Sequence, residues 1–102
     1  GQTKSFPKIG FEIKQLDDKD IKKYNIKEFT KGIIISNVKD NSKAFKSGLR
    51  EGMIIVRVGQ SEVSDLNVIT NAIEKAKKQK RNALLMLVNF EGADRFVAVE
   101  IF

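Results

Sequence analysis

The chain of 102 residues contains no histidine, no cysteine and no tryptophan. Without histidine and cysteine it lacks the side chains for Ser-His-Asp or Cys-His nucleophilic catalysis, for disulfides and for the usual zinc sites. No stretch approaches the roughly 18 consecutive apolar residues that a transmembrane helix needs, and no signal peptide is recognisable. We therefore expect no metal, no cofactor and no direct membrane insertion, and we expect this chain not to be an enzyme. A Ser-Lys dyad is the remaining route to catalysis, but no motif brings such a pair together.

The composition that is present is that of one globular domain. Hydrophobic residues make up 41% and charged residues 31% of the chain, and the formal net charge is +6. The basic residues are spread along the chain, and their densest run, from Lys75 to Arg81, falls at the end of an expected helix. Cations at that end are favoured by the helix dipole and point into solvent. No aromatic-plus-basic motif accompanies the charge, so we expect no nucleic-acid partner.

The order of strand and helix signals predicts an α+β fold. A strand with alternating polarity, Gly10–Leu16, is followed by a short helix that begins at Asp17 or Asp18 and reaches Tyr24. The later expected elements are a strand at 33–37, a helix from the Ser42 cap to Ser47, a strand at 53–58, a long helix from Ser64 or Asp65 to Lys78, and a hairpin of 83–90 and 95–102. The carboxylates of Asp17, Asp18 and Asp20 indicate helix capping, because the glycine and distal glutamate of a calcium loop are missing.

The most informative segment runs from Thr30 to Val38. Gly32 follows a polar turn and precedes Ile33-Ile34-Ile35, a run with the composition of a buried or half-buried strand. Glycine permits a sharp turn and leaves backbone N–H groups uncovered. A loop with free N–H groups that opens into a strand is able to hold a carboxylate and to pair with an extended peptide.

The long helix carries two neighbouring apolar stripes. At 100° per residue, Ile69, Ala72 and Ala76 lie on one stripe, and Leu66, Thr70 and Ile73 lie on an adjacent one. We expect the first stripe to face the core and the second to face something else. The alternative, that all of these residues simply belong to the core, remains open.

The chain resembles a PDZ domain of the bacterial HtrA/Deg (Do-like) serine-protease type, from Gly10 to Phe102. Besides the segments already described, the resemblance rests on Ala44, on Gly48-Leu49, on Gly52-Met53-Ile54-Ile55 and on Arg95-Phe96-Val97-Ala98-Val99. It is most similar to the second, C-terminal PDZ of such proteases. The resemblance implies a partly open β-barrel or sandwich of five to six strands with one long and one or two short helices, in the circularly permuted bacterial topology. We expect residues 1–8 to be linker or cloning residues and residues 9–102 to be the PDZ domain.

The resemblance also implies a function and a site. The function is peptide binding for a trypsin-like serine protease elsewhere in the polypeptide, in protein quality control and stress response in the periplasm or cell envelope. The expected ligands are unfolded-protein segments or C-terminal peptides, captured by addition of a strand. The expected site consists of Thr30, Lys31, Gly32, Ile33, Ile34, Ile35, Ser36 and Asn37, with Leu66, Thr70 and Ile73 as the opposite wall. Ile33 and Ile35 are expected to face the groove.

Two alternatives remain open at this point. Terminal PDZ domains of this family often hold an oligomer together by contacting other domains or subunits of the protease. C-terminal processing and intramembrane proteases of the envelope also carry similar PDZ domains.

Overall fold

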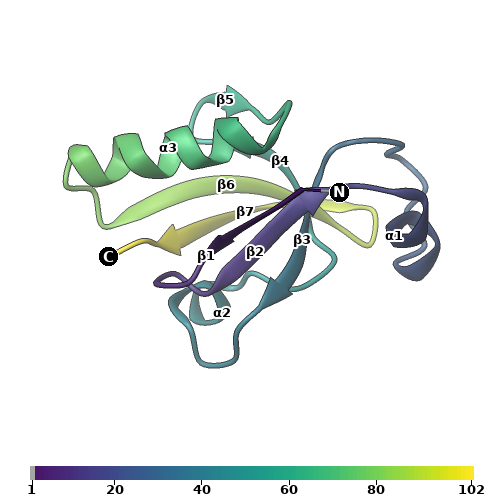
Figure 1. Ribbon diagram of the computed structural model, residues 1–102, viewed down its shortest axis with the longest axis horizontal. Helices are drawn as coiled ribbons and strands as arrows, with labels where there is room; N and C mark the ends of the chain where they lie inside the picture. Colours follow the sequence, from purple (N-terminus) through teal and green to yellow (C-terminus); the bar gives the residue numbers. More distant parts are fainter. Residues whose placement is uncertain (1) are drawn as a thin grey trace.

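A computed structural model describes residues 2–102, and its elements form one mixed sheet-and-helix domain (Figure 1). The strands are β1 (Thr3–Phe6), β2 (Phe11–Gln15), β3 (Ile33–Val38), β4 (Ile54–Val58), β5 (Ser61–Glu62), β6 (Ala83–Phe90) and β7 (Ala93–Glu100). The helices are α1 (Asp18–Lys23), α2 (Lys43–Ser47) and α3 (Leu66–Lys78). Among the described residues, no helix is long and apolar enough to cross a membrane.

All strand pairs in the sheet are antiparallel. The strand order is β1-β2-β3-β4-β6-β7, and the short β5 pairs with β4 beside this path. In Figure 1, β6 and β7 form a long hairpin below α3, while β1 and β2 run together across the sheet. The α+β class expected from the sequence is confirmed, and the described residues form seven strands where the resemblance implied five to six.

The helix ends follow the predicted capping residues. The Asp17 side chain caps α1, the Ser42 side chain caps α2, and the Asp65 side chain caps α3 by accepting the backbone N–H groups of Asn67 and Val68. Gly48 ends α2 in the left-handed conformation, with φ of 109°. Short polar side chains at N-caps satisfy N–H groups that the helix leaves free, and this local chemistry explains why the sequence predicted all three ends.

Strand β3 is covered on both faces, which explains its continuous apolar run. Ile33 and Ile35 belong to the main core cluster, with residues from β2, β4, β6 and α3. Ile34 belongs to a second cluster with Leu16 and Ile54, under the α1 helix and the segment that follows it. A strand buried on both faces needs apolar residues at consecutive positions instead of alternating ones.

Two segments differ from the sequence-based expectation. The N-terminal residues expected to be a linker include β1, so Thr3–Phe6 are part of the sheet, while Gly1 lies outside the described residues. The turn between β6 and β7 is shorter than the four-residue turn expected at 91–94, because β7 begins at Ala93. Glu91 and Gly92 form its two-residue connection with φ of 53° and 83°. Two consecutive positive φ values match the right-handed twist of the flanking strands.

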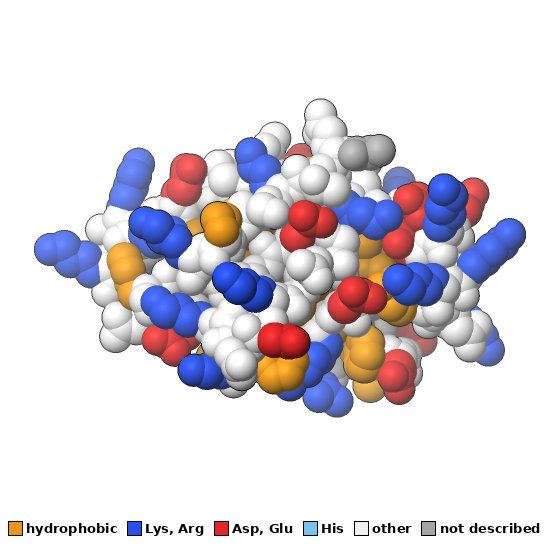
Figure 2. Space-filling model, turned by 60° about the horizontal axis from the view of Figure 1, so that its bottom comes forward, with side chains coloured by type: hydrophobic (Ala, Val, Ile, Leu, Met, Phe, Trp, Pro, Cys, Tyr) orange, Lys and Arg blue, Asp and Glu red, His pale blue; other side chains and the backbone are white. Residues whose placement is uncertain are grey.

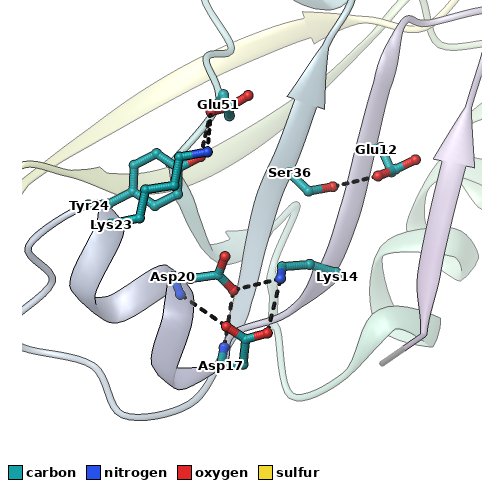
Figure 3. Close-up of polar contacts among 8 residues, drawn as sticks. All are labelled: Glu12, Lys14, Asp17, Asp20, Lys23, Tyr24, Ser36 and Glu51. Carbon is teal, nitrogen blue, oxygen red and sulfur yellow. Dashed lines mark hydrogen bonds and ion pairs between the residues drawn. The ribbon is translucent and has the colours of Figure 1, made fainter.

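The start of α1 also carries a cluster of opposite charges, drawn in Figure 3. The carboxylate of Asp17 accepts the backbone N–H of Asp20 at 2.9 Å, and Lys14 Nζ lies 3.1 Å from the same carboxylate. Lys14 Nζ also lies 3.0 Å from the carboxylate of Asp20. The Asp20 N–H bond and then the Lys14 ammonium lower the pKa of Asp17 from 3.8 to about 2.

We expect this lowered pKa to make stability depend on acid pH. The folded protein holds the Asp17 proton less tightly than the unfolded chain does. The contribution of Asp17 is therefore complete above about pH 4 and is lost as the pH falls toward about 2. Urea unfolding at several pH values should show that Asp17→Asn destabilises the protein most at pH 5, and that the gap between variant and wild type narrows toward pH 2. A gap that stays constant over this range would contradict the assignment.

Candidate functional site

The strongest candidate for a recognition site is the outer edge of β2 with the loop that precedes it. The backbone N–H groups of Ile9 and Gly10 both donate to the carbonyl oxygen of Phe6, at 3.0 and 2.7 Å. Two adjacent N–H groups aimed at one oxygen form a small concave donor site. The oxygen that they hold belongs to the last residue of β1.

This loop is held rigidly from its other side. The Gly10 carbonyl accepts the Lys39 N–H at 2.8 Å, and the Ile9 carbonyl accepts the Ala44 N–H at 2.8 Å. Gly10 has φ of 101°, and a Cβ at this position would lie only 2.1 Å from Cβ of Ser42. Only glycine fits between the loop and the start of α2. Lys39 and the start of α2 therefore hold the two carbonyl groups, and the two N–H groups face the Phe6 carbonyl at the end of β1.

Strand β1 lies along the edge of β2 in register. Thr3 is opposite Lys14, and Phe6 is opposite Phe11, with the two phenyl rings stacked at 4.9 Å between centroids. Since Phe11 and Ile13 are buried, side-chain alternation directs Phe6 and Lys4 to the core side of β1. Phe6 is half-buried against the main core cluster, and the other residues of β1 are exposed.

The first half of α3 lies across from this edge of β2 and forms the other side of the candidate site. A cavity of about 410 Å³ lies where β1, the end of β2 and the start of α3 meet, lined by Gln2, Thr3, Lys4, Gln15, Asp65, Leu66 and Asn67. Of the predicted wall residues, Leu66 and Ile73 are buried in the main core cluster, and Thr70 is half-buried with its hydroxyl donating to the Leu66 carbonyl. The two stripes expected on this helix therefore merge: Leu66 and Ile73 are buried together with Ile69 and Ala76.

The other predicted site residues lie elsewhere. Ile33 pairs with both Gln15 of β2 and Ile55 of β4, and the three isoleucines of β3 are each no more than 1% exposed. Ile35 also donates its N–H to the Met53 carbonyl and accepts the Gly52 N–H. The expectation that a peptide pairs along β3, with Ile33 and Ile35 facing a groove, does not fit this geometry. At Ile33 and Ile35 the backbone of β3 already pairs with β2 on one side and with β4 or the residues just before it on the other. Both side chains belong to the main core cluster.

The remaining residues of that segment lie at the ends of β3. Thr30 and Lys31 are exposed and Gly32 is half-buried at the start of the strand. Asn37 is exposed near its end, and half-buried Ser36 donates its hydroxyl to the Glu12 carboxylate at 2.8 Å (Figure 3). Since Gln15 is opposite Ile33 and Phe11 is opposite Val38, the Thr30–Gly32 turn lies at the opposite end of β2 from Ile9 and Gly10.

Sequence reasoning missed Ile9, Gly10 and the β1 segment as site residues. The signal was present, because Gly10 also precedes a strand of β-formers, Phe11-Glu12-Ile13. Two glycines satisfied the same pattern, and the sequence did not show which of the two strands would lie next to the edge of the sheet. Within residues 2–102 there is also no cluster of carboxylate, histidine or cysteine side chains able to hold a metal ion.

Comparisons with known proteins agree with this architecture. The family model described as "PDZ domain" matches residues 4–89. A probable periplasmic serine endoprotease DegP-like of Bartonella henselae is 37% identical over 71 residues, 70% of this chain and 14% of that protein. A protein of the same name from Chlamydia pneumoniae is 27% identical over 93 residues, 91% of this chain and 18% of that protein. The chain thus spans about a seventh of the length of the first of these curated relatives.

Two solved structures share the fold. The crystal structure of the HtrA3 PDZ domain bound to a phage-derived ligand (FGRWV) superposes with a TM-score of 0.70 at 22% identity and covers 97% of this chain and 86% of that one. The HtrA-type protease AlgW with a decapeptide superposes with a TM-score of 0.65 at 21% identity and covers 90% of this chain and 27% of that one. From the match to the family model, supported by this fold, the chain belongs to the PDZ domain family.

Proposed function

We propose that this chain is the peptide-binding module of an HtrA/Deg-type serine endoprotease and that it captures C-terminal or extended segments by adding them to its sheet. One observation carries the proposal: an extended segment, β1, already lies antiparallel on the edge of β2, and two loop N–H groups hold its terminal carbonyl. A peptide that takes this course would gain main-chain hydrogen bonds along β2 and side-chain contacts toward α3. The groove that we propose lies between β2 and α3 instead of along β3.

The proposal keeps part of the site expected from the sequence. Thr70 is the half-buried residue of the predicted α3 wall, and Leu66 borders the cavity beside β1. Thr30, Lys31 and Gly32 would lie at the end of β2 where the N-terminal part of an added peptide leaves the sheet. The carboxylate of a C-terminal peptide would meet the N–H groups of Ile9 and Gly10.

The names of the relatives support a periplasmic protease as the parent protein and a peptide as the ligand. Their names include periplasmic serine endoproteases, and the two structural relatives were solved with peptide ligands, one of which, FGRWV, ends in an apolar residue. We therefore propose that the parent protein is a periplasmic protease of protein quality control. The catalytic residues would then lie in another part of the polypeptide, since this chain has no histidine.

A second function, assembly with neighbouring subunits, is favoured by one observation. Leu85 and Phe96 are 48% and 68% exposed on the outer face of the β6–β7 hairpin, where Leu87 lies opposite Phe96. Apolar side chains gathered on an exposed sheet face are typical of protein contacts. On the face in Figure 2, lysine and arginine side chains are mixed with acidic side chains and with several hydrophobic ones.

A titration followed by NMR tests the first function against the second. We expect the ¹⁵N-labelled chain to bind a six-residue peptide that ends in a free apolar residue, with amide shifts at Ile9, Gly10, β2 and Thr70. The matched control is the same peptide with a C-terminal amide, which should bind at least fivefold more weakly because the charge-assisted bonds are lost. Shifts confined to the β6–β7 face, or none at millimolar peptide, would contradict the peptide-binding proposal.

A further inference from the structure

We propose that β1 is an internal ligand: the Thr3–Phe6 segment occupies the peptide groove, and a ligand must displace it to bind. The inference rests on the function proposed above and adds a form of regulation to it. In the structure, β1 takes the course that an added peptide would take, with Phe6 at the loop and Thr3 at the far end of β2. The groove is therefore filled by the protein's own chain.

The contact at Phe6 resembles the capture of a chain end. Its carbonyl oxygen accepts both loop N–H groups, and its ring stacks on Phe11 and packs against the core. The internal strand offers one neutral carbonyl to these donors. A free C-terminus in the same place would offer a carboxylate with two oxygens and a full negative charge, and hydrogen bonds to a charged acceptor are about twice as strong. The loop therefore favours a true chain end over the internal segment.

The internal strand is also weakly held. It has only four residues and pairs on one side, and Phe6 is its only side chain that is even half-buried. Short edge strands with few buried contacts belong to the parts of a protein that open at low cost. What keeps β1 in place is its short connection to β2 through Pro7–Gly10, which gives the segment a high effective concentration at the groove.

This balance predicts the ligand class and the effect on affinity. The preferred ligand is an extended peptide whose last residue has an aromatic side chain and a free carboxylate, as a replacement for Phe6. If β1 occupies the groove more than about nine-tenths of the time, the apparent affinity for such a peptide is lowered at least tenfold. Weakening β1 should restore that affinity.

The test uses the whole 102-residue chain and a fluorescein-labelled peptide with the sequence Gln-Thr-Lys-Ser-Phe and a free carboxylate, which copies residues 2–6. In fluorescence anisotropy, we expect Phe6→Ser to bind this peptide at least tenfold more tightly than the wild type does. The matched control is Thr3→Ala at an exposed position of the same strand, opposite Lys14, which should stay within twofold of the wild type. Circular dichroism verifies that each variant is folded.

A reversible lock keeps the test valid even if Phe6→Ser does not fold. The chain has no cysteine, so the double variant Ser5→Cys with Glu12→Cys introduces one cross-strand pair at directly opposed positions. We expect the oxidised protein to bind the peptide at least tenfold more weakly than the same protein after reduction. Equal binding by the oxidised and reduced forms would overturn the internal-ligand proposal and leave peptide binding intact. No binding by any form, including reduced protein and folded Phe6→Ser, would instead overturn the proposed function.

Discussion

We expect Gly10→Ala to destabilise the protein by roughly 2–5 kcal/mol. Gly10 has φ of 101°, a conformation that costs an L-residue about 1–2 kcal/mol. The new methyl group would also lie 2.1 Å from Cβ and 2.4 Å from Oγ of Ser42, at the start of α2. Moving that segment would disturb the bonds from Lys39 and Ala44 to the loop, and overpacking of this kind costs about 1–3 kcal/mol. Urea unfolding monitored by circular dichroism measures the loss.

Gly92→Ala is the matched control for this prediction. Gly92 also has a positive φ, 83°, but a Cβ there would meet no atom within 4 Å. Its substitution should therefore cost only the backbone strain of about 1–2 kcal/mol. Equal losses at the two glycines would show that the contact with Ser42 is relieved without cost, and that the loop is not held as tightly as the structure indicates.

The second large effect is expected at Ile35, in the middle of β3. Ile35→Ala should reduce the free energy of unfolding by about 2–5 kcal/mol, the usual range for removing a large buried aliphatic side chain. Ile35 is 0% exposed and packs in the main core cluster between the sheet and α3. Denaturant unfolding of the purified variant gives the value directly.

Asn37→Ala on the same strand is the control, because Asn37 is exposed and lies beyond the residues paired with β4. Its substitution should change stability by no more than about 0.5 kcal/mol. The two variants, Ile35→Ala and Asn37→Ala, distinguish a core role of β3 from a role in lining the peptide groove. If Ile35→Ala left stability nearly unchanged and weakened only peptide binding, β3 would line the groove and the core assignment would fail.

The local elements were predictable because short-range chemistry sets them. Asp17, Ser42 and Asp65 each cap a helix through bonds to backbone N–H groups two or three residues ahead, and Gly48 ends α2 in a conformation that favours glycine. The alternation of Phe11 and Ile13 with polar residues identified β2 for the same reason. The resemblance to PDZ domains also rested on such local spacing, and the family match confirms it.

The placement of the site was not predictable in this way. Gly10 and Gly32 both precede a run of β-formers, so the sequence offered two loops and two strands for one groove. Strand order decides between them: β3 lies inside the sheet between β2 and β4, and β2 lies next to the edge strand. Pairing between strands joins residues far apart in the chain, and no local pattern in one sequence encodes it.

The sequence by itself determined the helix ends, the positions of most strands, the PDZ family and the lack of a catalytic histidine or cysteine. Only the tertiary structure decided that the isoleucines of β3 are buried on both faces, and that residues 3–6 form a strand along β2. Capping and turn preferences act between residues a few positions apart, so they can be recognised along the sequence itself. Burial and edge availability depend on which distant segments meet, and Thr3–Phe6 have too few apolar residues to signal a strand until β2 and the Ile9–Gly10 loop are placed beside them.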